Sequence, residues 1–327
     1  MLITVAVPTH NRPWLLREAL ASIAAQTHPQ WEVVVVDDGS APPVLESTLR
    51  ELLGERFILI RHDQAQGIAA AKNAGVAAAR GEVVVHLDDD DLLAPTALAQ
   101  IAAAYARHPG LECLFVNVEP FGAYAPGTAA NQSRAVSGLL ERAQRPTDHG
   151  SRITDHSVAF FDRRLFTALL KSVPMAMQRP AARKTLWDRV GPLRRDSYLP
   201  EPEWAMKSAL LCEPALLLHC AYLARMDGQN NVTAPEQKLK HMHAAVDIRK
   251  TLLAWIARNP TLAGHAGEVR HSLAGAYFNQ AYHHQRNGHC RAAWRPLFAS
   301  FATHPQWYSL RFALRLLASC TKRREAD

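Results

Sequence analysis

Four consecutive carboxylates, Asp88 to Asp91, follow the segment EVVVHL at 82–87. Four ionised aspartates in a row repel one another, so a dry structural role is implausible. A divalent cation would relieve the repulsion, because carboxylate oxygens suit Mg²⁺ or Mn²⁺ and leave coordination positions open for phosphate oxygens. A solvated acidic turn capping the next helix is the alternative for this run taken alone. The run therefore predicts a metal and phosphate site.

Three more polar clusters follow apolar runs: Pro8-Thr9-His10-Asn11-Arg12, Asp37-Asp38-Gly39-Ser40, and the segment from Gly67 to Gly75 that contains Lys72 and Asn73. Carboxylates after a buried strand can accept hydrogen bonds from a base or a ribose, although Asp-Gly-Ser is also common turn chemistry. The chain lacks GxGxxG after its first apolar run and lacks the Walker lysine motif, which argues against a nicotinamide or flavin dehydrogenase.

The elements that carry these clusters have alternating strand and helix patterns. We predict strands at 2–7, 32–36, 57–60, 82–87 and 111–118, and helices at 13–25, 43–53, 67–80 and 96–107. This order predicts an α/β fold with a doubly wound, mostly parallel sheet, whose ligands gather at the carboxyl ends of the strands. Residues 120–155 have no clear periodicity and are predicted to form a loop over that edge. From about Pro235 we expect only helices.

The composition indicates a globular protein with an attachment. A length of 327 residues exceeds the size at which one core usually stops growing. The sequence has no apolar run long enough to span a bilayer and no signal-peptide pattern, so we expect a cytoplasmic protein. Five cysteines without CxxC spacing argue against a disulfide framework and against a zinc site.

The positive charge lies in the C-terminal part. From Ala234 onward there are 14 Lys and Arg against 5 Asp and Glu, which leaves 23 against 25 for the rest. Such a basic region favours peripheral contact with an anionic surface, such as the inner membrane surface, or with an acidic partner, while a solvated helical face is the alternative. The basic residues follow no nucleic-acid module pattern, so we expect no nucleic-acid partner.

The segments VAVPTHNRP, VVVDDGS, GIAAAKNAGVAAARGEVVVHLDDDD and the later GPL occur in the order found in family 2 glycosyltransferases. Over residues 1–233 the chain resembles a GT-A fold member, and 234–327 is then an all-α extension. The resemblance implies transfer of a sugar from a nucleoside-diphosphate sugar to an acceptor hydroxyl, with inversion and with Mn²⁺ or Mg²⁺. The acceptor is expected to be a saccharide or a lipid-linked molecule in polysaccharide or glycolipid assembly.

The resemblance also implies roles for individual residues. The nucleotide-sugar is expected at Pro8, Thr9, Asn11, Arg12, Asp37, Asp38, Gly67, Lys72, Asn73 and Asp89. Asp88 and Asp90 correspond to the metal-binding DxD pair, with Asp90 as the expected direct ligand and Asp88 near the ribose or a metal-bound water. Asp38 is expected at the base or the ribose.

Family members carry their general base in an acidic pair before a helix. Glu203 aligns best with that base and Glu201 is its rival, with Pro202 between them. The alternative for Glu203 is an ordinary first-turn carboxylate favoured by the helix dipole. Arg225 begins a segment that resembles a family loop and is a candidate phosphate ligand. That loop commonly has a histidine two residues later, where this chain has Asp227.

The C-terminal part carries two weaker patterns. Residues 273–306 match one tetratricopeptide-type hairpin through Ala281, Gly288, Ala293 and Pro305, and Pro296 is expected to disturb the second helix. The helix from Trp307 mixes aromatic, leucine and arginine residues, which is typical of an interfacial helix and equally of helix packing.

Two rival functions stay open beside an active transferase. A catalytically degenerate nucleotide-sugar-binding paralogue is suggested by Pro202 and Asp227. A nucleotidyltransferase with a similar sheet is disfavoured, because the glycine-rich, basic phosphate loop expected after its first strand is not seen.

Overall fold

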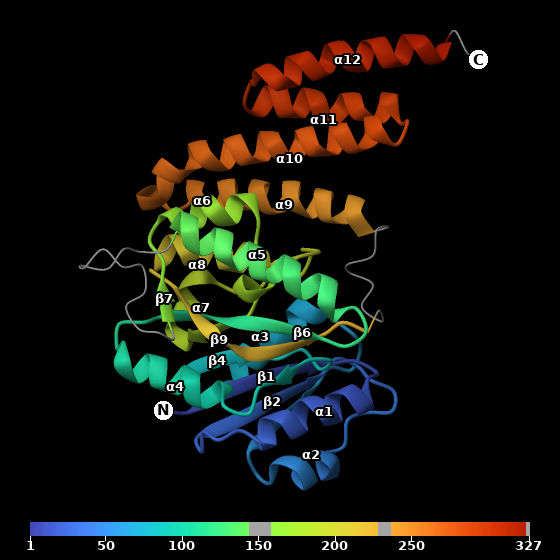
Figure 1. Ribbon diagram of the computed structural model, residues 1–327. Helices are drawn as coiled ribbons and strands as arrows, with labels where there is room; N and C mark the ends of the chain where they lie inside the picture. The colour runs from blue at the N-terminus through green and yellow to red at the C-terminus, as the bar shows by residue number, and fades with distance from the viewer. Residues whose placement is uncertain (144–157, 228–236, 325–327) are drawn as a thin grey trace. The chain divides into compact units, whose positions relative to one another are not determined.

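The computed structural model describes residues 1–143, 158–227 and 237–324 (Figure 1). The chain divides into two compact units. The first consists of Met1–Asp196 with Pro200–Asn230, and the second of Ser197–Leu199 with Asn231–Asp327.

The first unit is built on a sheet with a parallel half. Its strands are β1 (Ile3–Thr9), β2 (Trp31–Asp37), β3 (Phe57–Arg61) and β4 (Val83–His86), in the spatial order β3-β2-β1-β4. Helices α1 (Pro13–Ala24), α2 (Glu46–Leu53) and α3 (Ile68–Ala78) connect them. Every residue of β1, β2 and β4 is buried, as expected for strands covered on both faces.

The other half of the sheet is mixed. It contains β8 (Pro180–Arg183), β6 (Cys113–Phe121), β9 (Ala215–Arg225), β5 (Leu92–Leu93) and β7 (Val158–Phe160). Strand β8 is antiparallel to both β4 and β6, whereas β6 and β9 are parallel. The remaining helices are α4 (Ala97–Arg107), α6 (Arg164–Lys171), α7 (Lys184–Val190) and α8 (Pro200–Leu211), with a short 3-10 turn η1 (Met175–Gln178). The α/β fold class is confirmed, with antiparallel pairs that the sequence did not reveal.

The predicted loop at 120–155 is wrong over most of its length. Residues Ala125–Ala143 form the helix α5, which packs against α6 and β6. Its Val136 and Leu139 are buried three residues apart, so they anchor one helix face although the segment is rich in Gly, Ser and Asn. Residues 144–155 of that prediction lie outside the described residues.

The second unit is helical in its described part. It contains α9 (Lys238–Ala257), α10 (Ala266–Arg286), α11 (Cys290–Thr303) and α12 (Trp307–Arg324), with the 3-10 turn η4 (Pro260–His265). Contrary to expectation, α11 runs through Pro296, whose ring is buried. Ala281 and Ala293 share a core with Leu316, but a tetratricopeptide-type repeat stays a prediction. Among the described helices, none is long and apolar enough to cross a membrane.

A close backbone approach fixes β4 beside β1. Gly81, just before β4, donates its backbone N–H to Thr4 Oγ1 at 2.9 Å. A Cβ atom at this glycine would lie 2.7 Å from the backbone nitrogen of Thr4. Only glycine lets the chain enter β4 in this register, which sets where the acidic run emerges.

The Gly81→Ala variant is therefore expected to lose about 1–3 kcal/mol of unfolding free energy through overpacking. Urea unfolding measures the loss. The matched control is Gly110→Ala, where an added Cβ meets nothing within 4 Å. Equal unfolding midpoints for the two variants would contradict this role of Gly81.

Candidate active site

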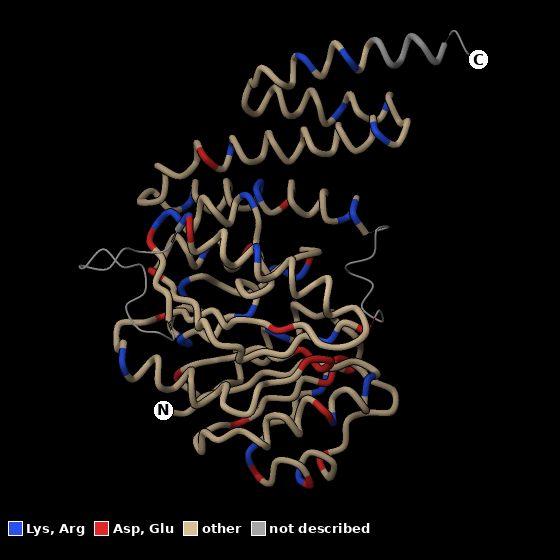
Figure 2. Tube along the Cα trace, in the orientation of Figure 1, with Lys and Arg blue, Asp and Glu red and all other residues tan. Residues whose placement is uncertain are grey.

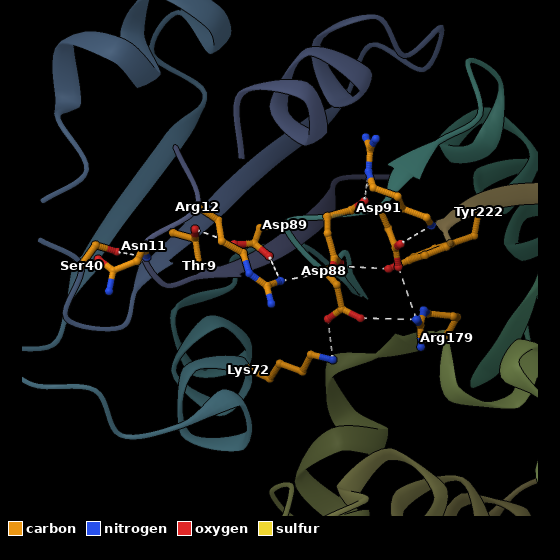
Figure 3. A network of polar contacts seen from close by, with 12 residues as sticks. Thr9, Asn11, Arg12, Ser40, Lys72, Asp88, Asp89, Asp91, Arg179 and Tyr222 are labelled. Atoms are coloured by element: carbon orange, nitrogen blue, oxygen red, sulfur yellow. Dashed lines mark hydrogen bonds and ion pairs between the residues drawn. The ribbon is translucent and has the colours of Figure 1, made fainter. Parts of the chain in front are cut away.

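The four polar clusters meet because parallel strands end at one edge of the sheet. In the register, Thr9 at the end of β1 pairs with Asp37 at the end of β2, and β4 runs beside β1. Thr9 Oγ1 donates a hydrogen bond to Asp89 Oδ2 at 2.7 Å. Arg12 Nη1 lies 3.1 Å from both Asp89 Oδ1 and Asp90 Oδ2 (Figure 3). The first and fourth clusters thus form one charged site.

Lys72 joins the acidic run to the start of α8. Its Nζ lies 2.8 Å from Asp88 Oδ1 and 2.7 Å from Glu201 Oε1. Burial would lower the pKa of Lys72, but the two carboxylates outweigh burial and raise this pKa above its usual value. Burial opposes ionisation of Asp88 as well, yet Lys72 and Arg179 hold its pKa well below the usual range. An ionised Asp88 is therefore held firmly in place.

Arg179 and Tyr222 complete the network and were missed by sequence reasoning. Arg179 Nη2 lies 3.3 Å from both Asp88 Oδ2 and Asp91 Oδ2, and its guanidinium sits 4.8 Å from the Tyr222 ring centroid. The Asp88 backbone N–H donates to the Tyr222 hydroxyl at 3.0 Å. Neither residue belongs to a local motif, so only the three-dimensional pairing of β8 and β9 with their neighbours reveals them.

Arg225, the predicted phosphate ligand, lies at the same edge. Its backbone N–H donates to Asp91 Oδ1 at 2.8 Å and its Nε donates to the Asp90 carbonyl oxygen at 2.9 Å. The guanidinium also pairs with Glu18, and it lies 3.4 Å from Asp227. Asp227 thus contacts Arg225, and the rest of that predicted loop, from residue 228, lies outside the described residues.

The carboxylates of Asp88 to Asp91 still repel one another despite these partners. Burial, with the neighbouring carboxylates adding to it, raises the pKa of Asp89 to about 6 despite hydrogen bonding to Thr9 and the charge of Arg12. Burial likewise raises the pKa of Asp91 to about 6, although Arg179 opposes it. The site holds more negative charge than its own cations neutralise, so a further cation is favoured there.

A divalent cation fits the donor set of this edge. In the described part of the chain, no cluster of three or more His, Cys, Asp or Glu side chains is arranged to hold an ion alone. A site with one or two carboxylates, completed by phosphate oxygens, is the usual arrangement for Mg²⁺. Asp90 offers such an oxygen. Among the described residues its carboxylate forms one ion pair, between Oδ2 and the half-exposed Arg12. Asp88 is held by Lys72 and Arg179 instead.

Asp37 and Asp38 hold the loops around the site. Asp37 accepts hydrogen bonds from the backbone N–H of Ser40 at 2.8 Å and of Val44 at 3.0 Å. Asp38 accepts from the backbone N–H of Gln66 and of Gly67, both at 2.8 Å. Burial would raise the pKa of both carboxyls, but hydrogen bonds outweigh it and lower both pKa values, with the His62 side chain contributing most for Asp38. Contact of Asp38 with a base or ribose stays a prediction.

The other residues predicted to bind the nucleotide lie in two places. Pro8 and Asn11 lie in or just after β1, whereas Asn73 makes a structural contact elsewhere. Asn11 has a left-handed backbone at φ 56°, and its side chain accepts a hydrogen bond from Ala41 N–H at 2.7 Å. Pro8 lies within β1, opposite Val36. Asn73 faces away from the acidic run, since it exchanges two 2.8 Å hydrogen bonds with the Leu193 backbone of the GPL segment.

A cavity of about 250 Å³ opens beside the loop after β1. Thr9, Asn11 and Arg12 contribute to its polar wall, while Leu16 and Leu20 of α1 contribute to its apolar wall. Three of the predicted nucleotide-sugar residues therefore line one open cavity.

The two candidate bases have different surroundings. Glu203 is 2% exposed, with Arg194 Nε at 3.0 Å and Lys207 Nζ at 2.7 Å from its carboxylate. Residues two positions apart in a helix point to different faces. Glu201 accordingly faces Lys72 and the acidic run, whereas Glu203 is neutralised inside the domain. The structure brings Glu201, rather than the better-aligned Glu203, to the site.

His86, at the end of β4, is a neutral core residue. It is buried, and its ring centroid lies 5.0 Å from that of Trp187. Burial, reinforced by the charge of Lys72, lowers the pKa of His86 to about 3.

The sheet and its flanking helices define an α/β protein, and the charged site lies at the strand edge where proteins of this class bind their ligands. Within that class, the model of glycosyl transferase family 2 matches residues 4–169, about half of the chain, and the chain belongs to this family. Over 119 residues it is 39% identical to the O-antigen biosynthesis protein RfbC of Myxococcus xanthus, covering 36% of this chain and 9% of that protein. The chain thus matches only a small part of that relative.

Two solved structures share the GT-A type fold. The first is S. aureus TarS 1-349 in complex with UDP-GlcNAc, with a TM-score of 0.61 and 18% identity over 93% of this chain and 82% of that chain. The second is the mannosyltransferase PcManGT from Pyrobaculum calidifontis in complex with GDP-Man and Mn²⁺, with a TM-score of 0.54 and 19% identity over 97% and 79%. At these identities the likeness shows the fold alone.

The Asp91→Asn variant is expected to flatten the pH dependence of stability. The pKa of Asp91 is about 6 in the folded chain, above the value of about 3.9 for an unfolded chain. Its contribution to stability is therefore complete below about pH 4 and is lost as the pH rises through about 6. Between about pH 5 and about pH 7.5 the wild type should lose about 1.4 kcal/mol more than the variant.

Urea unfolding at both pH values, without divalent cations, measures this difference. Asp188→Asn, at an exposed position of α7, is the matched control and should behave as the wild type. An equal pH dependence in the Asp91 and Asp188 variants would show that burial does not raise the Asp91 pKa.

Proposed function

We propose that this chain transfers a sugar from a nucleoside-diphosphate sugar to an acceptor hydroxyl, with inversion at the anomeric carbon. Residues 1–233 would form the catalytic domain and residues 234–327 a helical extension. The observation that carries the proposal is the single edge that combines Asp88 to Asp91, the cations Lys72 and Arg12, and the carboxylate of Glu201.

The similar proteins support the class of donor and acceptor. TarS is in complex with UDP-GlcNAc and PcManGT with GDP-Man and Mn²⁺, so a nucleoside-diphosphate sugar suits this fold. RfbC is named for O-antigen biosynthesis, which supports a saccharide or lipid-linked acceptor in polysaccharide or glycolipid assembly.

Asp90 is proposed as the direct ligand of Mn²⁺ or Mg²⁺, with Asp88 beside it. When bound, the metal supplies Lewis-acid charge that stabilises the departing diphosphate. The guanidinium of Arg12, whose side chain is 45% exposed, can turn from Asp90 towards a phosphate oxygen. Arg225 holds the Asp90 carbonyl oxygen and keeps the run in place from the β9 side. The chain thus offers an oxygen ligand and phosphate partners at one edge.

Glu201 is proposed as the general base in place of Glu203. In the reaction, the acceptor hydroxyl gives its proton to the Glu201 carboxylate, and its oxygen bonds to the anomeric carbon opposite the leaving diphosphate. The diphosphate departs with the electron pair of the broken bond, so the configuration inverts. Lys72 holds Glu201 Oε1 at 2.7 Å and leaves its other carboxylate oxygen to receive the proton.

The Asp90→Asn variant is expected to lose Mn²⁺-dependent binding of nucleoside diphosphates, because the carboxylate is the metal's proposed oxygen ligand. Its fold should be intact or slightly more stable, since one repelling charge is removed. Calorimetry with UDP and with GDP, with and without Mn²⁺, measures binding, and circular dichroism checks the fold. Asp188→Asn is the control, and metal-dependent binding that survives in Asp90→Asn would contradict the assignment.

Assays on the wild type and on the Asp90→Asn variant also distinguish an active transferase from a catalytically degenerate nucleotide-sugar-binding protein. An active transferase releases nucleoside diphosphate from a donor sugar in a Mn²⁺-dependent manner, and Asp90→Asn stops the release. Metal-dependent donor binding without any release over a panel of nucleotide-sugars would favour the degenerate paralogue.

The Glu201→Gln variant is expected to lower turnover by about 10²- to 10⁴-fold while donor affinity barely changes. The comparison variant is Glu203→Gln, which leaves Arg194 and Lys207 without their buried carboxylate. It should lose about 3–5 kcal/mol of stability but keep the turnover of its folded fraction. Steady-state kinetics and thermal unfolding give both readouts. The opposite pattern would assign the base to Glu203.

A further inference from the structure

Helix α12 carries large apolar side chains on the face opposite its core contacts. Phe312 and Leu316 pack into the helical core with Leu297 of α11. On the other side Trp307 is 80% exposed and Leu314 is 63% exposed, with Leu310 and Leu317 also exposed. Positions 307, 310, 314 and 317 recur at helical spacing and form one stripe. Helix packing therefore explains the buried face, whereas the side chains of this stripe stay exposed.

Positive charge accompanies the stripe. Between Val269 and Arg324 the sequence has nine Lys and Arg and no Asp or Glu. Arg311 and Arg315 are exposed on α12, four residues apart on the line beside the stripe. Figure 2 shows blue and no red on the described parts of α11 and α12. The exposed apolar side chains thus lie beside two exposed arginines, with no acidic residue in the described part of α12.

We propose that this α12 face, made of Trp307, Leu310, Arg311, Leu314, Arg315 and Leu317, docks on an anionic lipid surface. A lipid interface takes both components, since the arginines meet headgroup phosphates while the tryptophan and leucines enter the acyl boundary. The inference goes beyond the proposed sugar transfer and does not depend on it.

Other occupants match this face less well. A second copy would bring the same arginines against one another, which is repulsive. A nucleic acid would meet the arginines and could stack on Trp307, but the exposed leucines would gain little from phosphates or bases. Anionic lipid is the partner whose chemistry uses both the charge and the leucines.

The test measures sedimentation of the full chain with vesicles of phosphatidylcholine, with and without phosphatidylglycerol. We expect binding only to the anionic vesicles at low salt and release at high salt, because salt screens the attraction. The Arg311→Glu/Arg315→Glu variant should bind about 30-fold more weakly. Leu314→Asn should bind about tenfold more weakly, because its side chain no longer leaves water. Point variants are preferred to removal of α12, which would uncover its core partners.

The matched control is Arg270→Glu/Arg286→Glu, which makes the same change of charge at exposed positions of α10. It should stay within about threefold of the wild type, because those arginines lie outside the α12 face. A full chain that ignores anionic vesicles at low salt overturns the proposal, and so does a control variant that is weakened as much as the α12 variant.

Two further outcomes would also overturn it. One is concentration-dependent self-association that Leu314→Asn abolishes, which would assign the face to a second copy. The other is binding to an oligonucleotide that outcompetes anionic vesicles and that Leu314→Asn leaves unchanged, which would assign the charge to nucleic acid.

Discussion

Four consecutive carboxylates just after β4, of which Asp89 to Asp91 are buried and Asp88 is partly buried, constrain the rest of the first unit. Removing one partner of a buried ion pair costs about 3–5 kcal/mol, because the other charge is left uncompensated. Here the partners come from separate elements: Arg12 from the start of α1, Lys72 from α3, Arg179 from the entry to β8 and Arg225 from the end of β9. The acidic run therefore determines how elements far apart in sequence must meet.

These partners do not cancel the charge fully. The raised pKa values of Asp89 and Asp91 record the remaining cost of burial and repulsion. The proposed divalent cation would bring positive charge to this edge and relieve part of that cost, which would couple its binding to stability. Repulsion among these carboxylates would favour binding of a cation, which would relieve it. The residues that repel one another are those proposed to bind the metal and the donor, and such local costs are expected at functional sites.

The elements that could be predicted are those whose own sequence carries a clear pattern. The β-branched runs of β1 to β4 and the alanine-rich α3 are recognisable because propensity and burial agree there. The helix α5 was missed because its composition is that of a loop, and β5, β7 and β8 because two to four residues form strands only through distant pairing. The same limit applies to the site: Lys72 and Arg12 lie in motifs, whereas Arg179 has no local pattern. Glu201 and Glu203 are distinguished only by the faces of α8 that they occupy.

Charge is used differently in the two units. In the first, the cations near the acidic run are paired with carboxylates and hold elements together. In the second, the nine basic residues between Val269 and Arg324 have no acidic residue within that stretch. Like charges concentrated in one segment repel and destabilise its compact state. The buried core of the second unit stabilises the fold against that repulsion, but it does not account for the excess of basic residues. This core consists of Ala281, Ala293, Leu297, Phe312 and Leu316. Packing gains nothing from this charge, and the anionic lipid surface proposed for the α12 face would supply the counter-charge that the segment lacks.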